Sequence, residues 1–567
     1  MVAMLGLLAI ELVAFDGRTA PPVASPTYSS AAPAQTSPAG LLGALIEAGT
    51  LSDLYHPNFS DYRGYLRTFY QAGDYHLAWV RDGQPTPQAM AMTTVFVQAG
   101  QEGLAPEDYD GPYWTIRLAQ LRQHDSPASP AALARFDLEM TVSTMRYISD
   151  LHLGRVNPQV FNFGYNPAAR RFDLARFTRT QLIDADPARI PAIMAGLEPP
   201  FWVYRRMQKA LLEYEELAKN DDGRTLAVPA ATVNPGDVYA DLPRLVWFLR
   251  LVGDLPPDAS VSLKPAVYQE PLVSAVKHFQ ARHGLAPDGR LGVKTFKALN
   301  VPLTWRVEQL RLAMERWRWV PQHFSHPPVI VNIPEFMLRC WNDDYRNELQ
   351  MRIIVGKAYR HKTPVFYGQM RYVIFRPYWN VPASILHAEL LGKIQRNPGY
   401  LAANRYEVVT HDGSVVTSGV VTPAILARLR AGQLEVRQRP GPKNALGLVK
   451  FIFPNDHNVY LHSTPLPQLF NSSRRDFSHG CIRVQDPVGL AVWALRQKPG
   501  WDRDHVLAAM NGTQDNLEIR LDRPIPVLIV YGTAFVSRAG VVEFFDDIYG
   551  YDSELARALA AGAYPPG

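Results

Sequence analysis

The hydrophobic pattern of this chain changes its period near residue 320, and this change constrains the fold more than any other feature. Before it, apolar residues such as Phe136, Met140 and Ile148 recur at helical spacings. After it come runs such as VIVNIPEFMLRCW and MRYVIFRPYW, which are rich in β-branched and aromatic residues and bounded by Gly, Pro and Asn, as strands are. Because 567 residues are also too many for one core, we predict a multidomain α+β protein with a helical scaffold over 41–265 and a β-rich domain over 304–567.

A segment with a different sequence pattern interrupts the β-rich part between about residues 384 and 445. The stretches SILHAELLGKIQRNPGYL and PAILARLRAGQLE have helical spacing and polar surroundings rich in Pro and Gly, and strands resume at GLVKFIFP and NVYLH. We therefore predict a helical insertion within the strand-built domain. Insertions of this length often cap active sites.

A small two-helix unit is predicted just ahead of the β-rich part, over residues 266–303. Leu272, Val276 and Phe279 form one apolar stripe, Asp288-Gly289 marks a turn, and a second stripe begins at Val293. The string FQARHGLAPDGRLGVKT resembles the small helical peptidoglycan-binding domain of cell-wall enzymes, and a plain helical hairpin is the alternative.

The first residues favour export. Residues 2–14, VAMLGLLAIELVA, are apolar except for Glu11 but too short to span a bilayer, so they resemble the hydrophobic part of a secretory signal or a clipped anchor. An ordinary N-terminal helix is the alternative, since no Lys or Arg precedes the run. Residues 16–40 are rich in Pro, Ser and Ala and are predicted to be a flexible linker.

Charge and cysteine content exclude several classes of function. A net charge of +5 over this length is too weak to indicate nucleic-acid binding. With only Cys340 and Cys481, a disulfide framework and a four-cysteine metal site are impossible, and no HExxH, CxxC or clustered-carboxylate motif is present. We therefore expect neither a metal nor another cofactor. Cys340 lies in an apolar strand and is predicted to be a buried small hydrophobe.

The segment that carries chemistry runs from His462 to Arg483. His462 ends the strand NVYLH, and after a long loop comes Ser478-His479-Gly480-Cys481-Ile482-Arg483, just ahead of a helix. A thiol in such a loop can be activated by backbone dipoles and by an imidazole on an adjacent strand. Gly480 lets the backbone approach closely and leaves amide groups to face an oxyanion. Spacing thus predicts Cys481 as a nucleophile and His462 as its base.

The same segment resembles the signature of the L,D-transpeptidases of the YkuD-like fold. The stretches PYWNVP, RPGPKNALGLVKFIFPN and DIYGYD, with TFYQAGDYHLAW and GLAPEDYD near the N-terminus, are similar to the large periplasmic subfamily. The resemblance implies that Cys481 attacks the third residue of a donor stem tetrapeptide, that D-Ala leaves, and that an amine of a neighbouring stem resolves the thioester in a 3-3 crosslink. It also implies trapping by carbapenems and action in the periplasm. The partners that it implies are stem peptides and glycan strands, together with a membrane tether through the N-terminus and peptidoglycan synthases.

Individual roles follow from the resemblance. Ser463 holds His462 through its backbone carbonyl, and His479, Gly480 and Cys481 line the oxyanion site. Arg483 shapes the pocket or binds a substrate carboxylate. The remaining substrate wall is assigned to Tyr460, Trp379, Tyr378 and Asn380.

Several alternatives stay open. His479 could mainly order its loop, and the isolated His457, His361 and His387 receive no role. Five basic residues could form a rim that binds acidic stem peptides, or could simply be a solvated face of the protein. They are Arg474, Arg475, Arg437, Arg439 and Lys443. As a whole, the chain could instead be a cysteine peptidase that uses water as acceptor, or a catalytically silent wall-binding protein.

Overall fold

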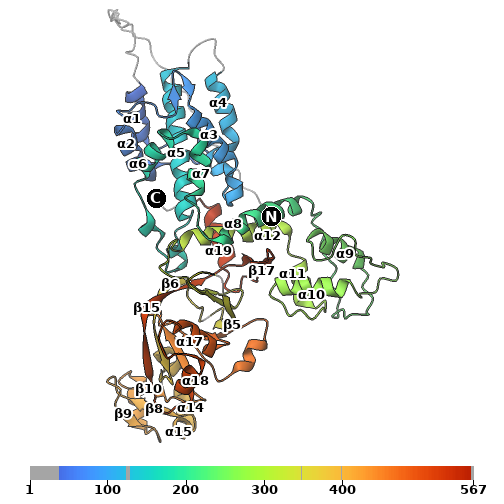
Figure 1. Ribbon diagram of the computed structural model, residues 1–567, viewed down its shortest axis with the longest axis vertical. Helices are drawn as coiled ribbons and strands as arrows, with labels where there is room; N and C mark the ends of the chain where they lie inside the picture. The colour runs from blue at the N-terminus through green and yellow to red at the C-terminus, as the bar shows by residue number, and fades with distance from the viewer. Residues whose placement is uncertain (1–37, 123–127, 346–347, 360, 398, 563–567) are drawn as a thin grey trace, which may run out of the picture.

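The computed structural model describes residues 38–122, 128–345, 348–359, 361–397 and 399–562. Figure 1 shows a helical body at the top, a β-rich body below it, and a small helical lobe that projects to one side. Two long helices, α8 (Trp202–Lys219) and α12 (Leu303–Trp319), cross the middle of the molecule and connect these parts. The α+β class predicted from the sequence is confirmed. The predicted signal over 2–14 lies outside the described residues.

The helical body is built around the long helix α5 (Pro130–Leu153), most of whose residues are buried. The Ser129 side chain caps its start by accepting a hydrogen bond from the Ala132 N–H, and Gly154 ends it with φ +90°. A Cβ at Gly154 would lie 2.6 Å from Trp319 Nε1, so only glycine allows α12 to approach this closely. Packed around α5 are α1 (Pro38–Ala48), α2 (Arg63–Gln71), α3 (Pro87–Val97), α4 (Trp114–Arg122), α6 (Leu174–Phe177), α7 (Ile190–Ala195) and the hairpin β1 (Val80–Arg81) with β2 (Gln84–Pro85).

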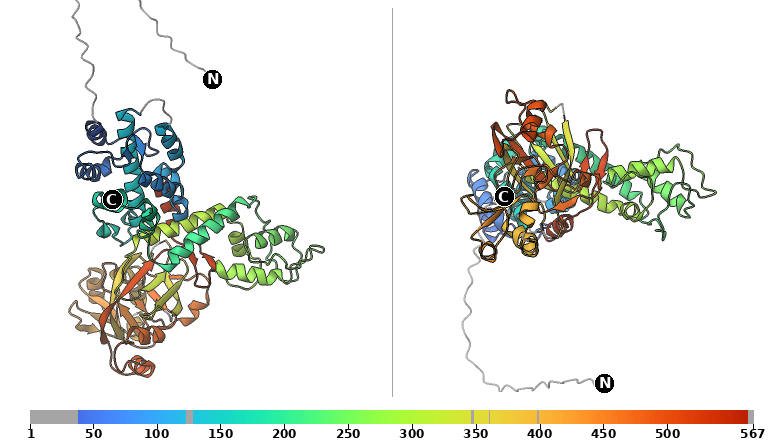
Figure 2. Two further views of the ribbon diagram at one scale, coloured as in Figure 1. Left: turned by 45° about the horizontal axis from the view of Figure 1, so that its top comes forward. Right: turned by 90° about the horizontal axis from the view of Figure 1, so that it is seen from below.

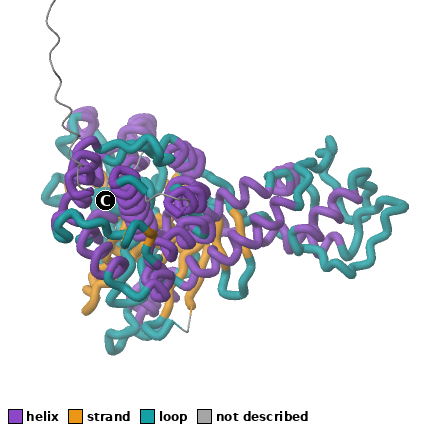
Figure 3. The backbone as a smooth tube through the Cα atoms, turned by 90° about the horizontal axis from the view of Figure 1, so that it is seen from above, coloured by secondary structure: helices purple, strands orange, loops and turns teal. Residues whose placement is uncertain are grey.

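The projecting lobe contains α9 (Leu242–Leu251), α10 (Leu272–Arg282) and α11 (Val293–Leu299), and Figures 2 and 3 show it standing away from the rest in other views. The predicted boundary at 266 left α9 in the scaffold. In the structure α9 packs on α10 instead, with the Phe248 and Phe279 ring centroids 6.2 Å apart. Two short amphipathic helices bury too little apolar surface by themselves, so a third completes the core.

The β-rich body is a closed sheet. Its strands follow the order β13-β5-β14-β12-β11-β6-β15-β3-β4, and β4 also pairs with β5, which closes the run from β5 to β4 into a barrel. The strands are β3 (Val329–Asn332), β4 (Met337–Trp341), β5 (Glu348–Gly356), β6 (Phe366–Phe375), β11 (Val449–Ile452), β12 (Leu461–His462), β13 (Asp476–Ser478), β14 (Ile482–Val484) and β15 (Leu517–Val530). The rest of this part comprises α17 (Pro487–Ala494), α18 (Arg503–Asn511), the hairpin β16 (Ala534–Val536) with β17 (Val542–Phe544), and α19 (Tyr551–Ala560).

The insertion between β6 and β11 is not purely helical, so that part of the prediction was incomplete. It contains a separate four-stranded sheet in the order β7-β10-β8-β9 and has a hydrophobic core of its own. Its strands are only two to four residues long, too short for a period-2 pattern to stand out. The elements are β7 (Trp379–Asn380), α13 (Ala383–Ile385), η9 (Leu386–Leu390), α14 (Leu391–Arg396), α15 (Tyr400–Ala403), β8 (Tyr406–Val409), β9 (Val415–Thr417), α16 (Pro423–Arg430) and β10 (Glu435–Gln438).

Among the described residues, no helix combines the length and the apolar character needed to cross a membrane. Within the same residues, no group of three or more His, Cys, Asp or Glu side chains is placed to hold a metal ion.

Candidate active site

Strand register brings the predicted catalytic residues to one face of the barrel wall. On neighbouring strands, Lys450 pairs with His462, and His462 pairs with Arg483. Directly paired residues point to the same side of a sheet, and residues two apart on one strand share that side. Tyr460 precedes His462 by two and Cys481 precedes Arg483 by two, and the Ile482 N–H donates to Tyr460 O at 3.1 Å, which extends the pairing to this level. A phenol, an imidazole, a thiol and two cations therefore gather on one surface.

The Cys481 thiol lies in a partly enclosed position beside Tyr460. Its Sγ atom is 3.7 Å from Asn458 O, and the Tyr460 side chain hydrogen-bonds to it. Burial raises the pKa of the Cys481 thiol, while Tyr460, Arg483 and Lys450 oppose that shift by stabilising the thiolate. Burial, and then the neighbouring Cys481, also raises the pKa of Tyr460, so its hydroxyl stays protonated as a donor. Tyr460, predicted only as substrate wall, thus touches the reacting sulfur.

His462 is buried and oriented by the backbone. Its Nδ1 atom lies 2.6 Å from Ser463 O, and because a carbonyl only accepts, Nδ1 carries the hydrogen and Nε2 holds the lone pair. Burial, followed by the Arg483 charge, lowers the pKa of His462 to about 3, so the ring is neutral and able to act as a base. No hydrogen bond joins His462 to Cys481 among the described residues. Such contacts often tighten only when substrate is bound.

Hydrogen bonds fix the loop that carries Cys481. The Ser478 hydroxyl donates to Cys481 O at 2.6 Å and accepts from the Gly480 N–H at 3.1 Å. Gly480 has φ +115°, a conformation suited to glycine. Its N–H is therefore already used, which corrects the expectation that this amide faces the oxyanion. The Cys481 N–H has no partner within the described ranges and is the better candidate for that role.

Two residues that sequence reasoning missed support this loop from behind. The buried Thr363 hydroxyl donates to Gly480 O at 2.7 Å and accepts from the Gly356 N–H at 2.9 Å. The Tyr549 hydroxyl accepts from the Thr363 N–H at 3.1 Å and donates to Gly356 O at 2.6 Å. Tyr549 belongs to the DIYGYD stretch, which supported the resemblance to the L,D-transpeptidases but had been given no role in the site. No local pattern pointed to Thr363.

The insertion reaches the catalytic loop through His479. Its Nε2 atom lies 2.6 Å from Glu389 Oε1, on η9, and its ring centroid is 4.7 Å from that of His361. Although desolvation opposes it, the hydrogen bond and charge of His479 lower the pKa of Glu389. His479 therefore links two parts of the fold, in line with a loop-ordering role. Glu389 gave no signal in the sequence.

The other predicted residues divide into two groups. Arg483 has no ion pair in the described part of the chain, its buried Nε lacks a partner, and burial lowers its pKa. Trp379 and Asn380 instead form β7 in the sheet of the insertion, and Tyr378 directly precedes that strand. The Arg437 guanidinium covers the Tyr378 ring at 4.5 Å, Trp379 packs near Tyr406, and Asn380 pairs with Arg437.

The proposed basic rim is largely engaged in structural contacts. Arg437 and Arg439 both pair with Glu407, and Arg474 pairs with Asp476. Arg475 is buried and donates to backbone carbonyls, which removes it from the surface. Cys340 is fully buried, as predicted for a small hydrophobe.

Comparisons with known proteins identify three domains in the chain. Residues 327–512 match the family described as "L,D-transpeptidase catalytic domain", residues 64–211 match "Scaffold domain", and residues 248–299 match "Putative peptidoglycan binding domain". A Haemophilus influenzae protein named "Putative L,D-transpeptidase" is 33% identical over 266 residues, which cover 46% of this chain and 51% of that protein. The aligned region thus spans about half the length of that relative.

A solved structure is also similar in part, the L,D-transpeptidase (residues 123–326) from Xylanimonas cellulosilytica. It is 15% identical with a TM-score of 0.17, and the match covers 54% of this chain and all of that one. The match of residues 327–512 places an enzyme's catalytic domain in the β-rich body, the part of the chain that holds Cys481, His462 and Arg483. Residues 327–512 therefore form an L,D-transpeptidase catalytic domain.

Proposed function

We propose that the protein is a peptidoglycan L,D-transpeptidase that forms 3-3 crosslinks. The observation that carries the proposal is the gathering of Cys481, Tyr460, His462 and Arg483 on one face through the pairing of β12 with β14. A thiol with a hydroxyl donor, a neutral imidazole and a guanidinium that has no ion pair with any described residue suits acyl transfer from a substrate that carries a carboxylate.

In the first half-reaction, Cys481 Sγ attacks the carbonyl carbon of the third residue of a donor stem tetrapeptide. The thiol proton passes to His462 Nε2, and the Cys481 N–H stabilises the developing oxyanion. The bond to D-Ala then breaks, His462 returns the proton to the leaving amine, and a thioester remains. Arg483 is available to pair with a substrate carboxylate.

In the second half-reaction, an amine of a neighbouring stem attacks the thioester carbonyl. His462 accepts a proton from this amine and returns one to the departing Cys481 sulfur, so a new amide forms and the thiol is restored. Neither half-reaction oxidises or reduces any group, so the scheme requires no cofactor. Water in place of the amine would give hydrolysis instead.

The experiment that tests the proposal is incubation with purified disaccharide-tetrapeptide, followed by separation of the products. A crosslinked dimer supports transfer, tripeptide alone would favour an L,D-carboxypeptidase, and no change would favour a silent wall-binding protein. The Cys481→Ala variant should form no product, whereas Cys340→Ala, in which a remote buried thiol is lost, should retain its turnover. Crosslinking by Cys481→Ala would refute the mechanism.

Carbapenems provide an independent test of the nucleophile. A strained β-lactam carbonyl can acylate the Cys481 thiol without a correct leaving amine, and mass spectrometry should locate one drug mass on the peptide that contains Cys481. An adduct on Cys340 would contradict the assignment.

We also propose action in the cell envelope on peptidoglycan, with the lobe of α9, α10 and α11 contributing affinity for the wall. Deletion of this lobe should reduce sedimentation with purified sacculi while turnover of soluble substrate persists. Export, a membrane tether and synthase partners remain predictions from the sequence.

A further inference from the structure

Two cations flank His462 on the strands to either side of it. In the strand order β11-β12-β14, Lys450 pairs with His462 and His462 pairs with Arg483. Because neighbouring strands are about 4.8 Å apart, the backbones of Lys450 and Arg483 lie about 10 Å from each other. Cys481 comes two residues before Arg483, so the thiol and Arg483 lie on one side of β12 and Lys450 lies on the other.

The Lys450 ammonium group has no partner within the described ranges of the chain. Its Nζ atom lies 5.8 Å from the centre of the Tyr460 ring but forms no hydrogen bond or ion pair with a described residue. Lys450 is half-buried, yet Nζ keeps contact with solvent, so a bound substrate can reach it. On the same face, Glu518 lies two strands away and makes no ion pair with it. Burial lowers the pKa of Lys450, so the ammonium form gains from a negatively charged partner.

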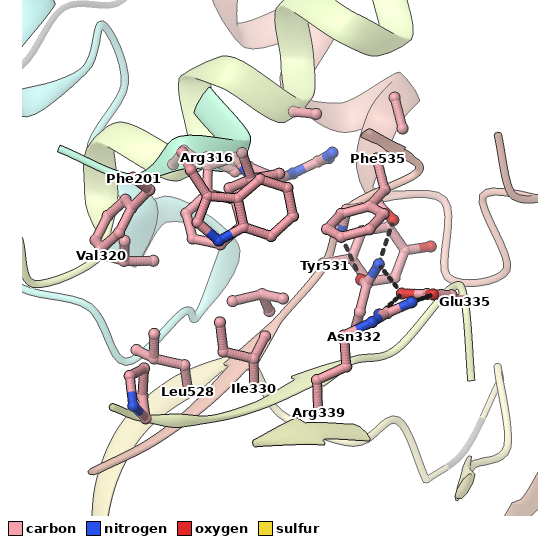
Figure 4. Close-up of a pocket in the computed structure, with 18 of the residues that line it drawn as sticks. Phe201, Arg316, Val320, Ile330, Asn332, Glu335, Arg339, Leu528, Tyr531 and Phe535 are labelled. Carbon is pink, nitrogen blue, oxygen red and sulfur yellow. Dashed lines mark hydrogen bonds and ion pairs between the residues drawn. The ribbon is translucent and has the colours of Figure 1, made fainter. Parts of the chain in front are cut away.

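Two other enclosed cations show the arrangement that Lys450 lacks. Figure 4 includes both, and in it Arg339 pairs with the Glu335 carboxylate beside β3 and β4. The other, Arg316, pairs with Asp552 at 2.6 Å. A cation that loses part of its hydration is stabilised by such a partner. For Lys450 that partner can come from the substrate.

The proposed reaction brings a carboxylate next to Lys450. His462 returns a proton to the amine of the departing D-Ala, so this nitrogen lies at the imidazole when the C–N bond breaks. The D-Ala carboxylate is attached to the same carbon as the amine, and it therefore lies close to the nitrogen. Since the acyl part remains on Cys481, on one side of β12, the departing residue extends toward the other side, where Lys450 lies.

We propose that Lys450 is a specificity-determining residue, which pairs with the free carboxylate of the donor's terminal D-Ala. The inference rests on the proposed function and names the feature by which this site selects its donor. A lysine ammonium forms a charge-assisted hydrogen bond with a carboxylate, and a stem whose terminal carboxylate is absent or displaced by a further residue loses that bond. Arg483, on the thiol's side of β12, remains available for a carboxylate of the acyl part.

The same pairing extends to the acceptor. The exact reverse of the first half-reaction has the D-Ala amine attack the thioester from the place where it departed, so its carboxylate again meets Lys450. An acceptor amine is therefore favoured when a carboxylate is attached to the carbon that bears it, as in any free D-amino acid. An alkyl amine without that carboxylate gains nothing from Lys450.

The test measures the release of the terminal residue from two donors that differ in one charge. One is disaccharide-tetrapeptide, and the other is the same compound with its terminal carboxylate converted to a neutral carboxamide. The measured quantity is the ratio of kcat/KM for the carboxylate donor to kcat/KM for the carboxamide donor. A change in the reactivity of the Cys481 thiol affects both donors alike and cancels in this ratio, which separates recognition of the carboxylate from an effect on the sulfur.

Wild type should prefer the carboxylate donor, and Lys450→Met, which keeps most of the side chain but not its charge, should lower the ratio about tenfold or more. Lys450→Arg, which restores a cation, should recover most of the preference. The matched control is Lys209→Met, the same change at a side chain 81% exposed on α8, and it should keep the wild-type ratio. Exchange of labelled D-alanine into the tetrapeptide should fall in Lys450→Met relative to exchange of D-alaninamide.

Two kinds of result would contradict the inference, and they are distinguishable. A wild type that turns over both donors without preference, or a Lys450→Met variant that keeps the wild-type ratio, would overturn this inference and leave the proposed function standing. Failure of the wild type to release the terminal residue of either donor would overturn the proposed function, and this inference with it.

Discussion

Replacing Tyr460 by phenylalanine removes one hydroxyl from beside Cys481 and should slow acylation of the thiol. The hydroxyl donates to the sulfur, and hydrogen bonds to charged groups contribute about 1.5–3 kcal/mol. At about 1.4 kcal/mol per factor of ten, the loss corresponds to an acylation rate about 10- to 100-fold lower at neutral pH. The pKa of the Cys481 thiol, already raised by burial, should rise further, because one of the groups that opposes that shift is gone.

The assay is alkylation by iodoacetamide and acylation by a carbapenem, both followed across pH in a Cys340→Ala background so that one thiol reports. The deficit of Tyr460→Phe should shrink at high pH, where thiolate forms without help. Tyr113→Phe, which removes a hydroxyl from a side chain 42% exposed, is the matched control and should have no effect. Wild-type reactivity of Tyr460→Phe at neutral pH would refute the assigned contact.

Three further outcomes follow from the site. Because burial holds the pKa of His462 at about 3, the acylation rate should show no sigmoidal loss centred near pH 6.5 as the pH is lowered. The same depressed pKa means that the contribution of His462 to folding stability is fully present above pH 6.5 and is lost as the pH falls toward 3. Unfolding measured across acidic pH values tests this loss. Thr363→Val should cost about 1–3 kcal/mol of stability in denaturant titrations and slow acylation, because Gly480 O loses its donor and a buried N–H is left unpaired; wild-type values for both would show that the contact is dispensable. Glu389→Gln should weaken the link to His479 by no more than about 1 kcal/mol, because the pair is partly exposed, and hydrogen exchange in the insertion should rise; unchanged exchange would mean that other contacts hold it.

The sequence alone predicted those catalytic residues that can be recognised from the residues next to them in the chain. Cys481 and His462 could be proposed as a pair because a thiol in a Gly-containing loop and an imidazole on a strand are recognisable types. The contact of Tyr460 with the sulfur depends on the register of β12 against β14, which the sequence does not display. The same applies to Thr363, which reaches Gly480 only after the barrel has closed.

Gly480 illustrates a second kind of limit. Its positive φ could be expected, since only glycine adopts that conformation easily. Whether its N–H faced the substrate or a side chain depended on Ser478, whose hydroxyl competes for it. The strands of the insertion were missed for a third reason, because segments of two to four residues carry too little pattern to be recognised.

The closure of the barrel has a consequence for how this enzyme tolerates change. A closed sheet has no edge between β6 and β11 to which a further strand could be added, so the chain that leaves and re-enters there must build its own sheet and core. Its length and sequence can therefore vary with little effect on the pairing that aligns Lys450, His462 and Arg483. The insertion is thus the part of the molecule whose sequence can diverge while the alignment of the candidate catalytic residues stays the same.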